Sequence, residues 1–299
     1  MRFNEVIVVY KECELGTNKT YQEVMDGFLP ALADFYAHPE NYNIEPFRIF
    51  GNLYYVGDRK VCMHLVDTGA GLILFDSGYS HNYNGLIAAI ERLGFSPADI
   101  KILIHSHAHF DHFGGGDRLR EKYGVKIYMS AVDTELTRQM PERALMHLAP
   151  GKEDAICYPD ITIEDGDEIC LGNTRIQCVL SPGHTPGTMS FFFQATDGEK
   201  SHNVGYWGGV GFLPLYKEYL CKYRLDSGML DILKNTIRNL RKYPVDIFLG
   251  NHPNHNCTLE KRRHMLDNPG ENPFINPAGW QIFLDAVEIR CADFQKLGY

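Results

Sequence analysis

The chain has 299 residues, 44% of them hydrophobic and 22% charged, which is the composition of a folded globular protein and excludes a disordered chain. A formal net charge of −9 leaves no overall cationic field to hold a polyanion, so we expect no nucleic acid partner. The first residues contain only one short apolar run, Val6 to Tyr10, too short for a signal-peptide core or a membrane span. These features predict a cytoplasmic protein without membrane contact and leave the oligomeric state open.

The cysteines are scattered along the sequence without a CxxC pair, and a chain of this length does not depend on a dense disulfide framework. We therefore predict reduced thiols, most of them buried. The eight positions are Cys13, Cys62, Cys157, Cys170, Cys178, Cys221, Cys257 and Cys291.

The N-terminal part, residues 1–45, is predicted to be an extension packed on the core. It contains a short β-like run and a helix around Tyr21 to Tyr36. We expect Pro30 to interrupt this helix, because proline lacks the backbone N–H and clashes with the preceding turn. The rest, residues 46–299, is expected to be one domain, because no repeat, linker or low-complexity tract divides it, and the whole chain is then a single globular unit.

Short apolar strands that end in Gly, Asp or Asn dominate the sequence from Phe47. Helices then alternate with strands, and residues 140–159 have the pattern of a loop. Strands are expected at residues 47–52, 53–58, 61–71, 72–78, 101–107 and 125–130, and helices at 85–95, 117–123 and 131–139.

A second group of strands follows this loop at hairpin spacing, with turn signals at Asp165-Gly166 and Gly172-Asn173. These strands predict a second sheet. They are expected at residues 161–172, 174–183, 189–196 and 203–209, and the chain then continues with a helix at 229–243, a strand at 245–252 and a helix at 280–298.

The strongest chemical signal is an HxHxDH motif, formed by His107, His109, Asp111 and His112 at the C-terminal end of an apolar strand. Imidazole nitrogens and a carboxylate are the ligands that borderline ions such as zinc prefer. A loop that leaves a rigid strand can also turn such closely spaced side chains inward together. We therefore predict that the motif binds metal, in preference to a solvated polar loop.

One motif supplies too few ligands for two metal ions, so further histidines are expected at the ends of other strands. His184 lies between two apolar strands, in a loop that a glycine and two prolines constrain. His252 follows the apolar strand at residues 245–252. Each could be an ordinary loop histidine by itself, but beside the first motif both are predicted metal ligands.

The HxHxDH motif, the GHTPG segment around His184 and a last histidine after a late strand together resemble the metallo-β-lactamase superfamily, and most of all its subclass B3. The resemblance covers roughly residues 46–255 and includes the segments IFGNLYYVG, GLILFDSG, YPDITIEDGDEICLG and DIFLGNHP. It implies a mixed α/β (α+β) fold, the four-layer αββα metallo-β-lactamase sandwich, with the metals in a groove at one edge of two central sheets.

The resemblance also implies two Zn²⁺ ions, one held by His107, His109 and His184 and the other by Asp111, His112 and His252. Iron or manganese are the alternative metals. Three protein ligands for each ion leave a position open for water, as in catalytic zinc sites. In this scheme a metal-bound hydroxide cleaves an amide, lactone or other acyl bond of a small molecule, β-lactams included, and Asp111 is the catalytic residue that orients the hydroxide and relays its proton.

Two features depart from an antibiotic-destroying enzyme of the cell envelope. The strand after the GHTPG segment lacks the metal-bridging aspartate of glyoxalase II and the acyl-homoserine lactonases, and Gly208 and Gly209 stand where subclass B3 enzymes often have a serine. An export signal is also missing from the sequence as it begins here. These departures favour another acyl substrate over a dedicated β-lactamase function.

Several other residues lie beside these motifs. Asp76 resembles a family position that fixes the orientation of the metal ligands through a hydrogen bond. We expect His105 to make a supporting hydrogen bond and His255 to be a loop residue near the groove. Five aromatic residues could line a pocket but are more typical of core packing, namely Tyr206, Trp207, Phe212, Tyr216 and Tyr219.

Three classes of function are compatible with these residues. The leading hypothesis is the dinuclear zinc hydrolase, including enzymes of the acyl-homoserine lactonase or thioesterase type. An iron-dependent oxidoreductase of the same fold is disfavoured, because His109 stands where diiron flavoproteins usually have glutamate and because no flavin domain is attached. A binding protein without catalysis is disfavoured by the intact motifs. The substrate cannot be read from the sequence, since loops such as residues 140–159 and 212–225 form the pocket walls.

Overall fold

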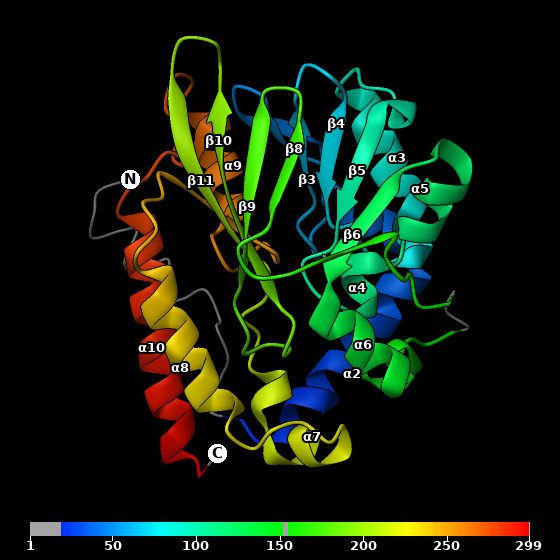
Figure 1. Ribbon diagram of the computed structural model, residues 1–299, viewed down its shortest axis with the longest axis vertical. Helices are drawn as coiled ribbons and strands as arrows, with labels where there is room; N and C mark the ends of the chain where they lie inside the picture. The colour runs from blue at the N-terminus through cyan, green and yellow to red at the C-terminus, as the bar shows by residue number, and fades with distance from the viewer. Residues whose placement is uncertain (1–18, 152–154, 299) are drawn as a thin grey trace.

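Two β-sheets pack face to face between outer layers of helices in the computed structural model, which describes residues 19–151 and 155–298 (Figure 1). The first sheet follows chain order and the second runs in the order β12-β11-β10-β9-β8. The first sheet contains β1 (Phe47–Phe50), β2 (Leu53–Tyr55), β3 (His64–Asp67), β4 (Leu72–Phe75), β5 (Ile100–Ile104), β6 (Lys126–Ser130) and β7 (Ile161–Ile163), and the second β8 (Glu168–Leu171), β9 (Thr174–Leu180), β10 (Met189–Thr196), β11 (Ser201–Trp207) and β12 (Ile247–Gly250).

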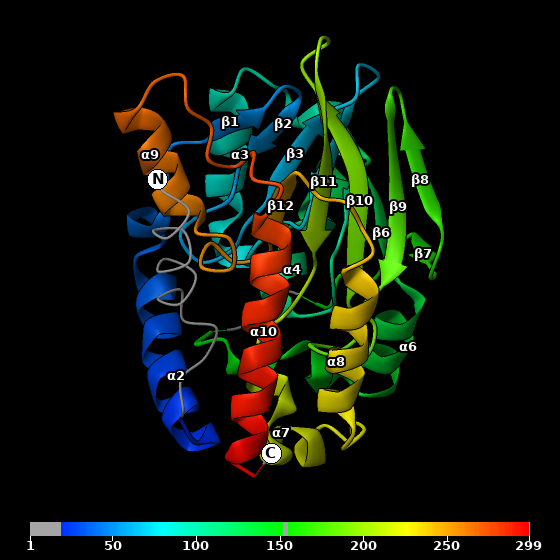
Figure 2. The ribbon, with the colours of Figure 1, turned by 90° about the vertical axis from the view of Figure 1, so that its left-hand side faces the viewer.

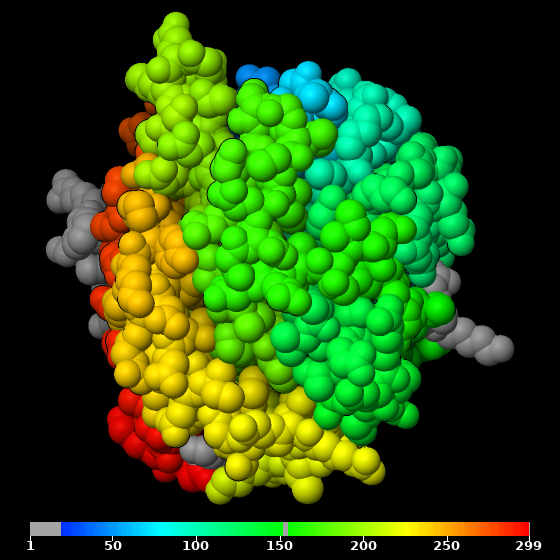
Figure 3. Space-filling view, in the orientation of Figure 1, coloured from blue at the N-terminus to red at the C-terminus, as the bar shows by residue number. Residues whose placement is uncertain are grey.

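Parallel pairing places the chemically important strand ends at one edge of the sandwich. Strands β4, β5, β6 and β7 pair in parallel, as do β11 and β12, so the loops after β5 and β12 leave their sheets at carboxyl ends. The loop between β9 and β10 lies there too. Figure 1 shows α2, α4, α6 and α7 gathered at this end, below the strands. The turn between β10 and β11 projects at the opposite end (Figure 3).

The helices complete the four layers. Helices α8 and α10 lie side by side over the second sheet (Figure 2), and α3 and α5 lie beside the first. The helix bounds are α2 (Tyr21–Ala37), α3 (Tyr83–Arg92), α4 (Phe110–Phe113), α5 (Gly116–Tyr123), α6 (Ala131–Gln139), α7 (Lys217–Lys222), α8 (Met229–Leu240), α9 (Thr258–Asp267) and α10 (Gly279–Lys296).

Strand β10 shows why the sheets stack in this way. Its side chains alternate between the two faces, as the pleat of a strand requires. Phe191 and Phe193 belong to the core between the sheets, whereas Phe192 belongs to the core under the helices and stacks on Tyr243 at 3.9 Å between ring centroids. A strand with both faces apolar must be covered on both sides, and this gives the αββα order. The predicted four-layer sandwich is therefore confirmed.

The N-terminal helix differs from the prediction, because α2 continues through Pro30. Thr20 and Glu23 form a capping box at its start, with the Thr20 backbone N–H 2.7 Å from a Glu23 carboxylate oxygen. Leu32 and Phe35 are buried in the core beyond the proline. Capping and burial together outweigh the hydrogen bond that proline removes. Residues 1–18 of the predicted extension lie outside the described residues, and the division after residue 45 stays a prediction.

Further predictions about the secondary structure need correction. The strand expected at residues 161–172 in the second sheet is divided, because β7 pairs with β6 in the first sheet and only β8 belongs to the second. Residues 140–159 include two short 3₁₀ helices, Pro141–Ala144 and Met146–Leu148, in place of an entirely irregular loop. Helix α9 was not predicted from the sequence. None of the described helices combines the length and apolarity needed to cross a membrane.

The cysteine prediction holds in part. Cys257 is disulfide-bonded, so the expectation of a reduced thiol is wrong there, and Cys13 lies outside the described residues. The others are free thiols, buried at Cys62, Cys157, Cys178 and Cys291 and exposed at Cys170 and Cys221.

Candidate metal centre

The six predicted ligands converge from three loops at one edge of the sandwich. His107 and His109 follow β5, and Asp111 lies on the short helix α4, which begins right after them. His112 is on α4 as well. The loop between β9 and β10 brings His184 from the second sheet, and the loop after β12 brings His252.

Three imidazole nitrogens form the first cluster. Nε2 of His107 lies 3.0 Å from Nδ1 of His109, and that atom lies 3.1 Å from Nε2 of His184. His107 and His109 are buried and His184 is partly buried. The separations match three ligand atoms that surround a common position.

In His107 and His184, the hydrogen bond made by the ring nitrogen outside the cluster determines which nitrogen carries the hydrogen. Nδ1 of His107 lies 2.8 Å from the Gly208 carbonyl oxygen, and Nδ1 of His184 lies 2.9 Å from that of Gly211. A carbonyl oxygen only accepts, so each Nδ1 donates and each Nε2 of the neutral ring presents a lone pair. These lone pairs face one another, an arrangement that a cation between them would stabilise.

A second cluster surrounds Asp111. Its Oδ2 lies 3.3 Å from Nε2 of His112 and 3.7 Å from Nε2 of His252. Nδ1 of His252 donates to the Lys60 carbonyl oxygen at 2.7 Å, which turns Nε2 toward the carboxylate. His107, Asp111 and His112 also satisfy the spacing of a metal site, so the two clusters adjoin at His107.

Burial and neighbouring charges set the protonation of the centre. Burial, reinforced by the surrounding histidines, holds the pKa values of His107 and His109 well below the usual range, and burial lowers the pKa of His184 to about 4. Burial would also lower the pKa of His112, but the carboxylates of Asp111 and Asp76 outweigh it and raise this pKa to about 10. The first cluster is thus neutral at pH 7 and ready to accept a cation.

Asp76 orients the second cluster, as predicted. Its carboxylate accepts hydrogen bonds from His112 Nδ1 at 2.8 Å, from the Ser106 N–H at 2.7 Å and from the Tyr206 hydroxyl. Its backbone φ is +57°, an unusual value for a non-glycine residue that these hydrogen bonds maintain. The ring of His112 cannot turn without breaking this network.

Asp133 is a supporting residue that the sequence analysis missed. Its buried carboxylate accepts hydrogen bonds from the Ala108 N–H at 3.0 Å, the Thr185 hydroxyl at 2.7 Å and the Gly187 N–H at 2.7 Å. One side chain thereby joins the loop of His107 to the loop of His184. The sequence signal was misleading, because Ser130 and Asp133 have the spacing of a helix cap, and Ser130 does cap α6.

The two glycines that replace a serine allow close contact with the ligand loops. A Cβ atom at Gly209 would lie 2.8 Å from the His184 ring, and one at Gly208 would lie 2.2 Å from the Met189 carbonyl oxygen. Side chains at these positions would displace His184 or separate the two sheets. Glycine here serves packing of the metal centre.

The remaining sequence candidates lie around the clusters. His105 is buried with Nε2 3.3 Å from the Ser77 hydroxyl, outside both clusters. His255 is buried beside His252, at 5.3 Å between ring centroids. Of the five aromatic residues, only Tyr219 contacts a predicted ligand, with its hydroxyl 3.4 Å from His109 Nε2. The Tyr206 hydroxyl contacts Asp76. The other three are packing residues: Trp207 packs on Trp280, and Phe212 and Tyr216 pack on Phe294.

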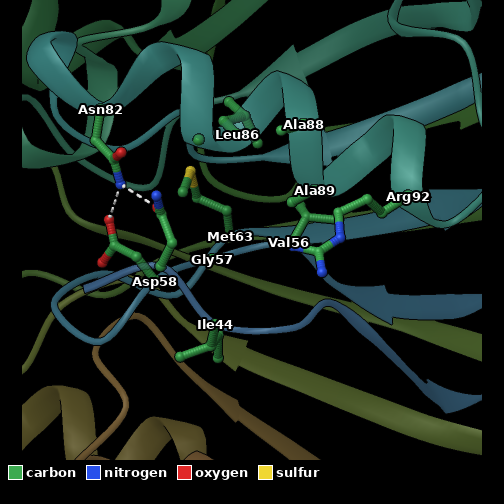
Figure 4. Close-up of a pocket in the computed structure, with 12 residues that line it drawn as sticks. Ile44, Val56, Gly57, Asp58, Met63, Asn82, Leu86, Ala88, Ala89 and Arg92 are labelled. Atoms are coloured by element: carbon green, nitrogen blue, oxygen red, sulfur yellow. Dashed lines mark hydrogen bonds between the residues drawn. The ribbon is translucent and has the colours of Figure 1, made fainter. Parts of the chain in front are cut away.

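The loop that holds His252 is itself fixed by a polar cluster. Asp58 accepts hydrogen bonds from the backbone N–H groups of Lys60 and Val61, at 2.7 and 2.9 Å. Asn82, directly before α3, donates to the other Asp58 oxygen at 2.8 Å, as Figure 4 shows, and also donates to Asn43. This polar cluster therefore holds the segment whose Lys60 carbonyl oxygen orients His252.

A cavity of about 290 Å³ opens beside the metal centre. His109, Asp111, His184 and His252 line it. Leu145 and Leu213 also line it, so the loops predicted as pocket walls do contribute. The helix α2 contributes more residues than either loop.

The chain is similar to known proteins both in sequence and in structure. Residues 56–197 match the model of the metallo-beta-lactamase superfamily. The probable metallo-hydrolase YqgX of Bacillus subtilis is 29% identical over 49% of this chain and 66% of its own length. The hydroxyacylglutathione hydrolase GloC of Haemophilus influenzae is 30% identical over 42% of this chain and 58% of its own length, so the match spans only part of these relatives. The crystal structure of BJP-1, a subclass B3 metallo-beta-lactamase of Bradyrhizobium japonicum, aligns with a TM-score of 0.74 at 25% identity, over 87% of this chain and 98% of that one.

Proposed function

We propose that the protein is a dinuclear zinc hydrolase that acts on small molecules, because residues 56–197 match the model of the metallo-beta-lactamase superfamily. The reaction adds water across an amide, lactone, ester or thioester bond and releases an acid with an amine, alcohol or thiol. The similarity to subclass B3 enzymes supports a cyclic amide as one substrate class, and the similarity to GloC supports a thioester as a second. A cytoplasmic location and the absence of a nucleic acid partner stay predictions.

The donor set fits two metal ions. We propose that His107, His109 and His184 hold one, where their lone pairs face one another. The other would lie with Asp111, His112 and His252. There the buried Nε2 of His112 makes no hydrogen bond of good geometry within the described part of the chain, although the Asp111 carboxylate is close. Nitrogen and carboxylate ligands without cysteine suit zinc, and they also suit iron or manganese.

Zinc, when bound, supplies a Lewis acid and lowers the pKa of a coordinated water molecule toward about 7. Residues of the chain orient the attacking water and accept its proton. Burial would raise the pKa of Asp111, but His112 and the other nearby histidines outweigh it and keep this pKa below its usual value. The ionised carboxylate can accept the hydrogen bond of the attacking water and take up its proton, while Asp76 keeps His112 from turning.

The convergence of six side chains from three distant loops carries this proposal. The test measures metal content of the purified protein together with hydrolysis of a chromogenic cephalosporin, an acyl-homoserine lactone and a thioester, before and after chelation. We expect about two zinc ions per chain and turnover that chelation abolishes and added zinc restores. Turnover that survives complete metal removal would contradict the proposal, and bound iron without hydrolysis would favour an oxidoreductase.

A further inference from the structure

We infer that α2 forms an acyl-binding wall beside the metal centre and selects small substrates whose acyl group is apolar. This inference rests on the proposed hydrolase function and specifies its substrate. Five side chains of α2 line the 290 Å³ cavity, spaced so that they lie on one face of the helix. They are Val24, Phe28, Ala31, Leu32 and Phe35.

The rest of the cavity divides into an apolar part and a reactive part. Phe110, Leu145, Leu213, Pro214 and the aromatic ring of Tyr79 continue the apolar wall, and Tyr79 also carries a polar hydroxyl. The rest of the polar lining consists of four proposed metal ligands and Lys60, which is the only other charged residue among the described residues that line the cavity. A substrate whose scissile carbonyl lies at the metal ligands therefore places its acyl chain against α2.

Aromatic contacts hold the C-terminal half of α2 in place. The ring of Phe35 packs edge-on against Tyr79 at 5.2 Å, and Tyr79 packs in the same way against Phe110 at 5.2 Å. Phe110 belongs to α4, the helix that also carries Asp111 and His112. Tyr36 stacks on His81 at 3.7 Å. The wall is thus tied directly to the element that presents the proposed ligands.

The N-terminal end of α2 is anchored separately. The Tyr216 hydroxyl donates to the Lys19 carbonyl oxygen at 2.7 Å, and its ring lies 5.8 Å from that of Tyr21. Val24 and Phe28 lie between the two anchors and are only partly buried by the protein itself. Their remaining apolar surface faces the cavity, where an apolar acyl group would cover it.

This chemistry separates two kinds of acyl group. Transfer of an alkyl or aryl acyl group from water to an apolar wall is favourable. The hydroxyl of a hydroxyacyl group would meet no polar partner on the α2 face, and burying it there would cost free energy. We therefore expect hexanoyl esters to be better substrates than acetyl esters, and hydroxyacylglutathione to be a poor one.

The test compares hydrolysis of p-nitrophenyl acetate and p-nitrophenyl hexanoate by the zinc-loaded wild type and by Phe28→Ala and Val24→Ala. The wild type should prefer hexanoate in kcat/KM, by about fourfold for each methylene that becomes buried. Both variants should lose most of this preference through a higher KM for hexanoate. Leu29→Ala is the matched control, because Leu29 is 41% exposed on the same helix and does not line the cavity.

Binding without turnover gives a second readout. Calorimetry with acetohydroxamate and hexanohydroxamate, which bind zinc, should show the same chain-length preference, lost in Phe28→Ala and Val24→Ala and kept in Leu29→Ala. An unchanged preference in both α2 variants, no preference in the wild type, or no binding of either compound would overturn the inference. If hexanohydroxamate binds preferentially but no ester, lactam or thioester is hydrolysed, the proposed hydrolase function is contradicted, whereas the inference that α2 forms an apolar binding wall is supported.

Discussion

The buried carboxylate of Asp133 accepts a hydrogen bond from the Thr185 hydroxyl, 2.7 Å away, across 52 residues of sequence. The same carboxylate holds the backbone beside His107, through Ala108, and beside His184, through Gly187. One side chain thus joins two loops that would share a metal ion, although it is not itself a proposed ligand and does not line the 290 Å³ cavity.

Asp133→Asn should therefore weaken metal binding more than it weakens folding. An amide replaces one acceptor oxygen with a donor, so at least one of the three hydrogen bonds is lost and a loop is freed. We expect about 10-fold to 100-fold lower zinc affinity, measured by chelator competition. Glu135→Gln, an exposed change on the same helix, is the control. Equal zinc affinity in Asp133→Asn and the wild type would refute the positioning role.

Metal removal should destabilise the protein. Nδ1 of His109 lies 3.0 Å from Nε2 of His107 and 3.1 Å from Nε2 of His184, and only the folded state brings these nitrogens together. Free zinc at 100 times its dissociation constant should add about 2.7 kcal/mol to the free energy of unfolding. Urea unfolding with zinc and with chelator measures the difference. His184→Ala should reduce the zinc-dependent part, whereas an identical zinc response in that variant would count against the proposed ligand.

His64 should make the fold sensitive to acid. It is fully buried between the rings of Tyr55 and Tyr206, and neither of its ring nitrogens has a hydrogen-bond partner among residues 19–151 and 155–298. Burial lowers its pKa to about 3 despite the opposing effect of Asp76. Below the unfolded-state value of about 6.5, the unfolded chain binds a proton that the folded chain does not, so stability falls as the pH falls from 6.5 toward 3.

His64→Leu should remove this contribution. The free energy of unfolding should then change less steeply in that window, by up to about 1.4 kcal/mol per pH unit. Denaturant unfolding from pH 4 to 7 gives the slopes, with His38→Leu as the exposed control. Parallel slopes for His64→Leu and the wild type would show that His64 does not couple to folding.

The buried Lys261 should make the stability of the fold depend on pH in the alkaline range. Its ammonium is buried 5.4 Å from the Phe274 ring centroid, and burial lowers its pKa to about 8. Between pH 8 and about 10.5 the unfolded chain holds the proton and the folded chain releases it, so stability rises with pH in this range. Lys261→Met should be more stable than the wild type at pH 7, by about 1 to 3 kcal/mol, and should lack the rise. A less stable Lys261→Met, with exposed Lys217→Met unchanged, would contradict this.

The sequence predicted the sheets and the ligand positions because both depend on local pattern. The short apolar runs of β5 and β10 are typical of buried strands whatever lies around them. The HxHxDH spacing is equally local. His184 and His252 were predicted from their positions at the ends of apolar strands, and the family resemblance supplied the division of the six ligands between two ions.

What the sequence did not predict depends on contacts between distant segments. Asp133 resembles part of a helix cap until its partners at Ala108 and Gly187 are seen. Helix α9 buries little beyond Thr258 and Lys261, so it has no apolar stripe for periodicity to detect. The apolar face of α2 indicates a buried helix, but nothing local shows that part of it lines a cavity instead of the core.

The proposed ligands are divided between the two sheets, and this division sets an order of events during synthesis. The motif after β5 emerges from the ribosome long before His184, and His252 emerges later still. A nascent chain therefore lacks the complete set of six proposed ligands until all strands of the second sheet have been made. Metal acquisition becomes a late step that reports on correct docking of the two sheets, and a chain cut short before residue 184 cannot retain the first ion through these ligands.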